Sequence, residues 1–465
     1  MNVFARIIII FVYITSLVAA EKAVVLTSIA RDAVLEELTG EKRFDRDVLI
    51  KRYPYLNEPG AAFVTLQKQR RLRGCIGSLQ AYRPLIDDVI ANAKAAAFRD
   101  SRFHPLKRSE LESVDIEVSI LSAPEAVPYR TVGELQEKIV PGRDGIILTR
   151  GPHRATFLPQ VWEQMDDFED FFHLLCRKAG LDAECLQLHP DIARYGVIRY
   201  DEYNVSKRSM ANAGLFYPNS CAELESWFAN TPAMPKRVKP SGRIKALIVP
   251  HAGYKFSGAT ADLVYRAAAN SGAKHIVVLG PSHFISYKGI SSAPVDALAT
   301  PCGMVVNDTA VLTRLKKDFT PVYIPQVHDN EHSTEVQFPF VQHYFPYVPV
   351  TELVYGEVEP ERLKAMVSRL LAMPDVLLIV STDLSHYYDQ ERAHRKDFHC
   401  LDAVTAADPA PLRHCEACGK PGLQALLEAA REKGLKTQLI DYRTSADATG
   451  DTSRVVGYMS AVVYE

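Results

Sequence analysis

Histidine and aspartate side chains follow three aliphatic runs in the second half of the sequence. His251 follows I-K-A-L-I-V-P, and His283 follows H-I-V-V-L-G-P-S. Asp383 and then His386 follow V-L-L-I-V-S-T. Each run has the length and composition of a buried parallel strand, and open α/β sheets bind ligands beyond the carboxyl ends of such strands. The pattern therefore predicts a metal site at one sheet edge, with His251, His283 and His386 as ligands.

The segment H-D-N-E-H-S-T-E-V-Q, residues 328–337, adds further groups that can transfer protons. His332 and Glu335 are three positions apart, so they share a face if a helix begins near Ser333. One interpretation gives them a general acid/base role or a place beside the metal ligands. The other makes Glu335 part of a helix cap and His332 a buried hydrogen-bond donor.

The second half of the chain alternates strands with helices. Strands are expected near 244–250, 274–280, 348–355, 375–381, 437–443 and 453–464, with helices such as 258–271, 361–372 and 422–433 between them. This alternation predicts an α/β domain with a doubly wound, mostly parallel sheet. Neither G-x-G-x-x-G after the first strand nor G-x-x-x-x-G-K-[ST] occurs, which argues against dinucleotide and P-loop nucleotide binding.

The first half mixes elements without strict alternation. A helix is expected over 22–38, two strands joined by a basic turn over 61–79, and a helix over 85–98. Further strands and an amphipathic helix near 168–179 predict an α+β domain. A polar stretch near 201–212 marks the boundary. The predicted organisation is a signal-like or anchoring segment 1–20, a first domain 21–203, a linker 204–211 and a second domain 212–465.

Cys75 is a candidate functional residue of the first domain. It lies in R-L-R-G-C-I-G-S-L, where Arg73 and the flanking glycines favour a reactive thiol or an anion-binding turn. His104 is the nearest candidate for a partner base. The alternative is that Cys75 is a small core residue where two strands approach closely.

Charge and cysteine content narrow the classes of function. A net charge of -2, without a basic stripe, argues against a nucleic-acid partner. The eight cysteines are scattered through a chain with ample core, so most are expected to be buried thiols. The lone pair Cys415 and Cys418, spaced C-x-x-C, is weak evidence for zinc.

The amino-terminal residues 1–20 carry one arginine, an apolar stretch and a V-A-A exit. This layout fits an export signal or an anchor. The alternative is a buried first helix of a cytoplasmic protein. The apolar stretch is shorter than the roughly 20 residues of a spanning helix, and no integral membrane bundle is expected.

Motifs in the first domain resemble the Ammecr domain family. They are R-L-R-G-C-I-G-S-L at 71–79, F-R-D-S-R-F-H-P-L at 98–106 and G-I-I-L-T-R-G-P-H-R-A-T-F-L-P-Q-V-W at 145–162. The resemblance implies a fold and little chemistry.

Motifs in the second domain resemble the Memo family, in the expected order. They are A-G-L-F-Y-P at 213–218, P-H-A-G-Y at 250–254, G-P-S-H-F at 280–284, E-H-S-T-E at 331–335, S-T-D-L-S-H at 381–386, A-C-G at 417–419 and R-V-V-G-Y at 454–458. Memo proteins are similar in fold to the class III extradiol dioxygenases, which are non-haem iron enzymes. The resemblance implies that His251, His283 and His386 face a cleft, with Asp383 orienting an imidazole.

The resemblance also bears on the metal. Some Memo proteins place a cysteine from the final loop at the cleft, but residues 444–454 contain none here. An oxygen ligand is expected in its place, from Ser445, Asp447 or Asp451. Imidazoles with an oxygen ligand and open positions favour Fe(II), whereas a thiolate would favour copper or zinc.

Two hypotheses for function follow. The first is a metal-dependent redox enzyme acting on a small-molecule or peptide substrate, with His386 as acid/base. The second is a binding or scaffold protein that uses the cleft for a peptide or protein. Because the two domains resemble components of the AmmeMemoRadiSam system, a separate radical-SAM protein is the expected partner. This chain has no C-x-x-x-C-x-x-C run that could hold the cluster itself.

Overall fold

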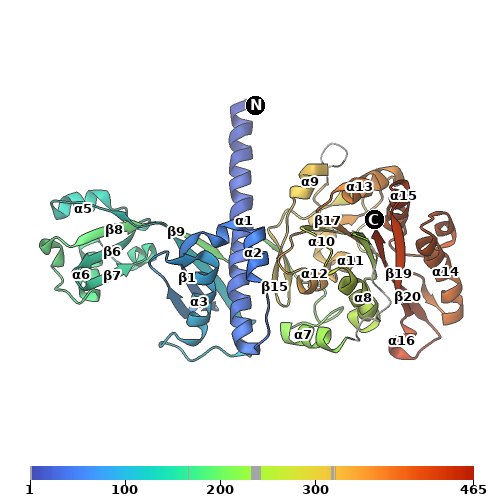
Figure 1. The fold of residues 1–465 in the computed structure, drawn as a ribbon, viewed down its shortest axis with the longest axis horizontal. Coiled ribbons are helices and arrows are strands. Elements are labelled where there is room, and N and C mark those ends of the chain that lie inside the picture. Colours follow the sequence, from blue (N-terminus) through green and yellow to red (C-terminus); the bar gives the residue numbers. More distant parts are fainter. Residues whose placement is uncertain (1–2, 166, 232–241, 316–318, 320) are drawn as a thin grey trace. The chain divides into compact units, whose positions relative to one another are not determined.

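The computed structural model describes residues 3–165, 167–231, 242–315, 319 and 321–465 (Figure 1). The chain divides into two compact units. One comprises residues 25–204, and the other comprises residues 205–465 together with residues 1–24. Each unit is described by itself below.

The unit of residues 25–204 is α+β with antiparallel sheets, as predicted. One sheet has the order β2-β1-β4-β9, with β3 paired to β1, and the other has the order β5-β8-β6-β7. The strands are β1 (Pro59–Lys68), β2 (Arg71–Gly77), β3 (Arg83–Pro84), β4 (Val114–Leu121), β5 (Glu125–Ala126), β6 (Gly145–Arg150), β7 (His153–Phe157), β8 (Asp191–Tyr195) and β9 (Val197–Asp201). The helices are residues 25–39 of α1 (Val3–Thr39), α2 (Arg46–Arg52), α3 (Leu85–Phe98), α4 (Arg108–Leu111), α5 (Val132–Lys138) and α6 (Phe168–Lys178).

The second unit is built on an eight-stranded sheet of order β13-β16-β12-β17-β11-β20-β18, with β19 paired to β20. Its strands are β11 (Ile244–Val249), β12 (His275–Pro281), β13 (Ile290–Ser291), β16 (Val350–Tyr355), β17 (Val376–Ser381), β18 (His386–Tyr388), β19 (Lys436–Thr444) and β20 (Val455–Tyr464). The four central strands β16, β12, β17 and β11 are parallel. Their outer neighbours are antiparallel, so the sheet is mixed, and only its centre has the parallel order that the sequence predicts.

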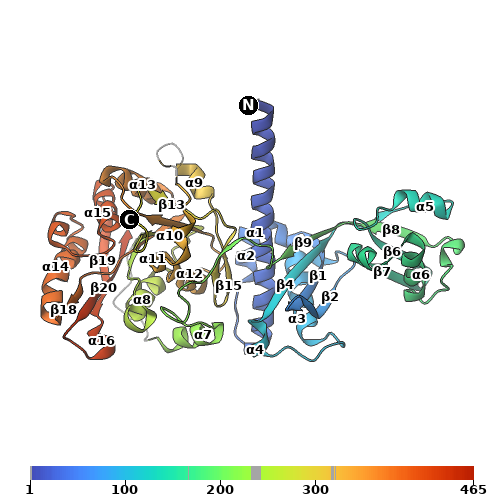
Figure 2. The same cartoon turned by 180° about the vertical axis from the view of Figure 1, so that it is seen from behind.

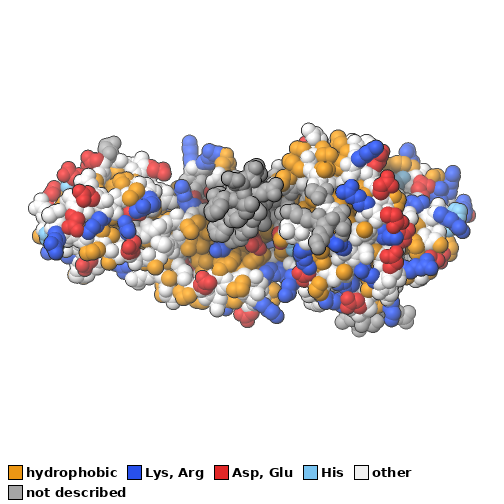
Figure 3. Space-filling model, turned by 90° about the horizontal axis from the view of Figure 1, so that it is seen from above, with side chains coloured by type: hydrophobic (Ala, Val, Ile, Leu, Met, Phe, Trp, Pro, Cys, Tyr) orange, Lys and Arg blue, Asp and Glu red, His pale blue; other side chains and the backbone are white. Residues whose placement is uncertain are grey.

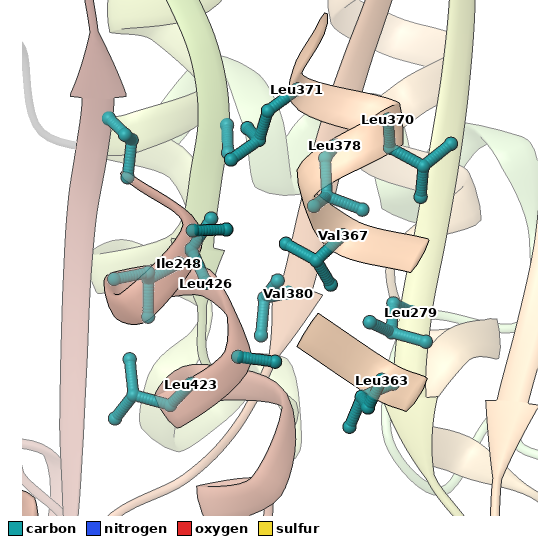
Figure 4. Close-up of a cluster of buried hydrophobic side chains, with 14 of the residues drawn as sticks. Ile248, Leu279, Leu363, Val367, Leu370, Leu371, Leu378, Val380, Leu423 and Leu426 are labelled. Carbon is teal, nitrogen blue, oxygen red and sulfur yellow. The ribbon is translucent and has the colours of Figure 1, made fainter. Parts of the chain in front are cut away.

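Helices cover both faces of this sheet, which is the doubly wound arrangement (Figures 1 and 2). They are α7 (Cys221–Asn230), α8 (Ala259–Ala268), α9 (Ala310–Leu315), α10 (Pro325–Asp329), α11 (His332–Glu335), α12 (Phe338–Tyr344), α13 (Pro360–Ala372), α14 (Gln390–Ala406), α15 (Lys420–Glu432) and α16 (Ala446–Thr449). On one face, Leu363 and Val367 of α13 and Leu423 of α15 pack on Leu378 and Val380 of β17 (Figure 4). A second core lies on the other face, under α7, α8 and α12. Removal of this apolar surface from water drives the packing of both layers.

Part of the predicted linker 204–211 belongs to the second unit. Lys207–Arg208 form β10, which pairs in parallel with β14 (Ala297–Thr300). Strand β14 pairs in turn with β15 (Gly303–Val306). Arg208 is buried, although polar stretches of this kind are typical of exposed connections.

Six of the eight cysteines form disulfides, so the prediction that most are simply buried thiols is wrong. The bonds join Cys176 to Cys185, Cys221 to Cys302 and Cys400 to Cys415, and leave Cys75 and Cys418 free. Sequence spacing alone does not reveal which cysteines pair when separations range from 9 to 81 residues.

Thiol labelling tests this pairing. Denatured but unreduced protein is expected to take up two alkyl groups, on Cys75 and Cys418, whereas reduced protein takes up eight. Intact-mass spectrometry of protein folded under oxidising conditions measures both numbers. Uptake of eight groups without reduction would show that the three bonds do not form.

The surface carries charges of both signs, in keeping with the nearly balanced charge of the sequence. Lys and Arg side chains are interspersed with Asp and Glu over the face seen in Figure 3. Among the described residues, no helix combines the length and the apolar character that crossing a membrane requires.

Candidate metal centre

Three histidines from separate loops meet beyond the parallel strands of the second unit. His251 lies two residues after β11, His283 lies two residues after β12, and His332 opens α11. One potential ligand atom from each lies within 4.8 Å of those of the other two. The ring centroids are 5.0 Å apart for His251 and His283, 5.4 Å for His251 and His332, and 4.5 Å for His283 and His332.

His251 presents its Nε2 atom to the centre of this cluster. Its Nδ1 lies 2.9 Å from Ser381 Oγ, whose own hydroxyl donates to the Ser333 carbonyl oxygen at 2.6 Å. Ser381 Oγ therefore accepts from His251 Nδ1–H, and this tautomer leaves a lone pair on Nε2. Burial, followed by the neighbouring His283, lowers the pKa of His251 well below its ordinary value. His251 is thus neutral, as a metal ligand must be.

Glu331 fixes the orientation of His283. Its carboxylate accepts from His283 Nδ1–H at 2.9 Å and from the His283 main-chain N–H at 2.6 Å. Burial alone would raise the pKa of Glu331, but these bonds from His283 lower it to about 2. A carboxylate on the far ring nitrogen is the usual partner of a metal-bound histidine. Nε2 of His283 is again the free nitrogen.

His332 is held at the amino terminus of α11. Gly280 makes this possible, because a Cβ atom there would lie 2.5 Å from Ser333 Oγ, so only glycine lets α11 approach the end of β12. The His332 ring packs against Phe216, with 4.6 Å between centroids. Burial, with His251 and His283 nearby, lowers the pKa of His332 to about 4. Its Nδ1 is buried without a hydrogen-bond partner.

Cys418 adds a sulfur atom to the three imidazoles. Its Sγ lies 3.1 Å from His251 Nε2 and accepts from the Asp383 main-chain N–H at 3.2 Å. Burial, followed by the Asp383 carboxylate, raises the pKa of the Cys418 thiol to about 12. The sequence offers Cys418 in the motif A-C-G and in a C-x-x-C pair with Cys415, but Cys415 is bonded to Cys400.

Asp383 contacts the main chain of His251 next to the cluster. Its Oδ1 accepts from the His251 N–H at 2.8 Å, and its own carbonyl oxygen accepts from the Cys418 N–H at 3.2 Å. Burial raises the pKa of Asp383 above its ordinary value. Asp383 therefore joins the loops that carry His251 and Cys418. The strand before Asp383, β17, lies between β12 and β11 in the sheet.

His386 is not part of the three-histidine group, which takes His332 instead. Its Nδ1 donates to the Leu384 carbonyl oxygen at 2.7 Å, so Nε2 carries a free lone pair. The imidazole is half-buried. This arrangement suits a proton acceptor beside the cluster better than a third ligand within it.

Glu335 is a buried structural residue of α11. Its carboxylate accepts from the Asn212 N–H at 2.7 Å and from the Tyr217 hydroxyl at 2.8 Å. The sequence left an acid/base role and a capping role open for Glu335. Its observed hydrogen bonds serve neither role. It ties α11 to residues 211–217, with only 1% of its surface exposed.

The three predicted oxygen ligands of the final loop serve local contacts instead. Asp447 accepts from the Thr444 N–H at 2.7 Å, and Asp451 accepts from the Ser453 N–H at 2.8 Å. Ser445 Oγ accepts from the Val456 N–H at 3.1 Å. None of the three belongs to the histidine group found among the described residues.

In the first unit, Cys75 lacks the surroundings of a reactive thiol. Burial raises its pKa, against the effects of Thr65 and Arg102. Arg73 is bound to Glu110 at 3.2 Å and to the main-chain oxygen of His104 at 2.9 Å, and the His104 side chain is exposed. Gly74 serves packing, because a Cβ atom there would lie 2.2 Å from the Ala96 carbonyl oxygen.

The chemistry of the histidine cluster fits a transition-metal ion. Burial lowers the pKa of His251 and of His332, and outer partners accept from the Nδ1–H of His251 and of His283. The His332 Nδ1 has no hydrogen-bond partner among the described residues. A second group, Cys221, Glu225 and Cys302, also has ligand atoms close together. Its two sulfur atoms are bonded to each other, so that group is a disulfide beside a carboxylate.

Comparisons with known proteins agree with both resemblances. The AMMECR1 family model matches residues 27–200, and the model described as Memo-like protein matches residues 208–462. A MEMO1 family protein of Thermotoga maritima is 34% identical over 280 residues, covering 56% of this chain and 100% of that protein. A MEMO1 family protein of Thermoplasma acidophilum is 32% identical over 268 residues, covering 55% of this chain and 98% of that protein.

A solved structure also matches part of the chain. The crystal structure of an uncharacterized protein from Pyrococcus horikoshii has 33% sequence identity and a TM-score of 0.36, and covers 39% of this chain and 92% of that one. The family models match the two units in turn. The chain therefore belongs to the Memo-like protein family and carries an AMMECR1 domain fused in front of its Memo domain.

Proposed function

We propose that the Memo domain is a metal-dependent redox protein that binds copper through His251, His283 and His332. The observation that carries the proposal is the convergence of three imidazoles, each held by a different loop. Outer hydrogen bonds set the tautomers of His251 and His283, which orients both rings for a metal ion.

The choice of copper rests on Cys418. Iron was expected because the final loop contains no cysteine, but Cys418 reaches the cluster from the turn before α15. A thiolate beside three imidazoles is a softer set of donors than imidazoles with oxygen, and soft donors favour copper or zinc over iron. Of these two metals only copper changes oxidation state, which the redox hypothesis requires. Zinc would instead support hydrolysis.

The surrounding residues have separate tasks in this proposal. A bound copper ion would supply one-electron chemistry to a substrate held beside it. His386 would accept a proton at Nε2, since its Nδ1–H is engaged by the Leu384 carbonyl oxygen. Asp383 and Glu331 keep the loops of His251 and His283 in place.

The substrate class follows from the exposed side chains near the cluster. Phe284, next to His283, is 60% exposed, and its ring lies 5.8 Å from that of His332. Tyr387, next to His386, is 63% exposed, and the Arg454 guanidinium lies 4.5 Å from its ring centre. These side chains suit a small molecule or peptide with an apolar part.

Metal content tests the proposal. Protein prepared without oxygen and offered equal amounts of Fe(II), Cu(I) and Zn(II) is expected to retain about one copper ion per chain. The double variant His251→Ala/His283→Ala should retain none while staying folded. The matched control is His399→Ala/His414→Ala, a pair whose rings lie 5.4 Å apart but which has no third ligand among the described residues.

Each other outcome has a clear meaning. Iron in place of copper would restore the iron hypothesis and remove Cys418 from the ligands. Zinc would replace the redox reaction with a hydrolytic one. No metal in the wild-type protein would overturn the proposal.

Proton release provides a second prediction. The lowered pKa values of His251 and His332 let both bind without losing a proton, whereas the pKa of Cys418 is about 12, so its thiol must lose a proton to bind a metal ion. We expect close to one proton released per ion at pH 7, and none in Cys418→Ser. Calorimetry in buffers of different ionisation enthalpy measures this number. Equal release by both proteins would exclude Cys418 as a ligand.

A binding or scaffold role is the second candidate, favoured by the exposure of Leu215, which is 81% exposed beside Phe216.

We further propose a separate radical-SAM protein as the partner, because the AMMECR1 and Memo domains occur here in one chain. Co-purification with that protein, before and after metal removal, tests both ideas. Retention of the partner by the His251→Ala/His283→Ala variant would favour the scaffold role, and no association at all would reject the partner.

A further inference from the structure

Arg208 is a buried cation at the start of the Memo domain, and it holds the main chain that leads to α11. Its Nε donates to the His328 carbonyl oxygen at 3.0 Å, and its Nη2 donates to the Glu331 carbonyl oxygen at 2.6 Å. Only 4% of its side chain is exposed. One guanidinium therefore fixes both ends of the segment 328–331.

That segment carries the group that orients His283. The Glu331 carboxylate accepts from the His283 Nδ1–H and from the His283 main-chain N–H. It also accepts from the Ser333 N–H at 2.9 Å. A shift of the Glu331 main chain would move this carboxylate. Glu331 therefore connects Arg208, which holds its main chain, to His283, which its side chain orients.

Arg208 also faces two buried carboxylates beside the third histidine. Its Nη2 lies 3.5 Å from Glu335 Oε2, and its Nη1 lies 3.4 Å from Glu352 Oε1. Glu335 is the last residue of α11, and Glu352 accepts a hydrogen bond from Thr334 of the same helix. The helix that begins with His332 is thus bound to Arg208 by charge as well as through the main chain.

We propose that Arg208 is a positioning residue for the metal centre, which acts through Glu331 on His283 and through α11 on His332. The inference rests on the proposed metal-binding function, and it assigns a role to a residue that the sequence places in a linker. A planar guanidinium with several fixed N–H donors can hold two carbonyl oxygens at once, which a lysine ammonium cannot do in the same geometry.

The test compares Arg208→Met and Arg208→Lys with wild type by two measurements. In metal-free protein, NMR of ¹⁵N-labelled histidines should show His283 protonated at Nδ1 in wild type and as a mixture of tautomers in Arg208→Met. Titration with Co(II) as the probe should show affinity about 10-fold weaker in Arg208→Met, with an altered absorption spectrum. Arg208→Lys, which keeps the charge, should remain weakened.

The matched control is Lys245→Met. Lys245 is another buried cation of this domain, and it donates to the Met373 carbonyl oxygen at 2.9 Å near the opposite ends of the parallel strands. This variant should lose thermal stability while keeping the His283 tautomer and the Co(II) spectrum.

Three results would overturn the inference: an unchanged His283 tautomer in both Arg208 variants, full recovery in Arg208→Lys, or the same spectral change in Lys245→Met. If Arg208→Met does not fold, Arg208→Lys decides alone. Because the NMR measurement uses metal-free protein, it tests Arg208 even where wild type binds no Co(II), which would count against the proposed function separately.

Discussion

His332→Ala is expected to abolish tight metal binding, whereas His386→Ala is expected to leave it nearly unchanged. His332 supplies one of the three clustered ligand atoms, and its buried Nδ1 has no hydrogen-bond partner among the described residues. Loss of a direct ligand should exceed the roughly 10- to 100-fold cost of losing an outer partner. His386, which lies outside the group, should instead affect turnover through proton transfer.

Competition with a chelator of known affinity measures both variants. His332→Gln serves as a control for side-chain volume, because it fills the space next to Phe216 without an imidazole. A large loss of affinity in His386→Ala with a small one in His332→Ala would return His386 to the ligand set that the strand pattern predicts.

Glu335→Ala is expected to destabilise the Memo domain by about 3–5 kcal/mol, because it removes one of the two carboxylates that face the buried Arg208 and leaves the Asn212 N–H and the Tyr217 hydroxyl without their acceptor. Because Glu335 also holds α11 in place, metal affinity should fall together with stability. An acid/base role would instead reduce turnover and leave the free energy of unfolding unchanged. The exposed Glu357 is the matched control, and Glu357→Ala should change stability by less than about 0.5 kcal/mol.

Urea denaturation followed by tryptophan fluorescence measures this loss. The chain has two tryptophans, one in each unit, so Trp162→Phe leaves Trp227 as the reporter of the Memo domain. A loss below about 1 kcal/mol would show that Glu335 is not held in a buried ion pair, and it would reopen the acid/base interpretation.

The aliphatic runs were sufficient to predict the centre of the Memo-domain sheet. Strands β11, β12 and β17 match their expected ranges, because a buried parallel strand has a continuous apolar pattern that is local in sequence. The same pattern placed His251 and His283 at one edge. Both lie in the observed cluster, since the strand immediately before each histidine fixes its place.

The other members of the site depend on contacts that no local pattern carries. His332 enters because Gly280 lets α11 approach β12, and Cys418 enters because Asp383 holds its turn. His386 satisfies the same strand-end rule as His251, but its loop turns the Nδ1 atom toward its own backbone. Strand ends define an edge of the sheet, whereas loop packing selects which side chains meet there.

The sequence by itself determined the two domains, their families and two of the three clustered histidines. Only the tertiary structure decided the third histidine, the nearby thiol, the three disulfides and the buried role of Arg208. The physical reason is the distance in sequence over which each kind of interaction acts. Strand and helix patterns arise from neighbouring residues, while ligand sets and cysteine pairs join residues from distant parts of the chain, whose meeting depends on the packing of the whole domain.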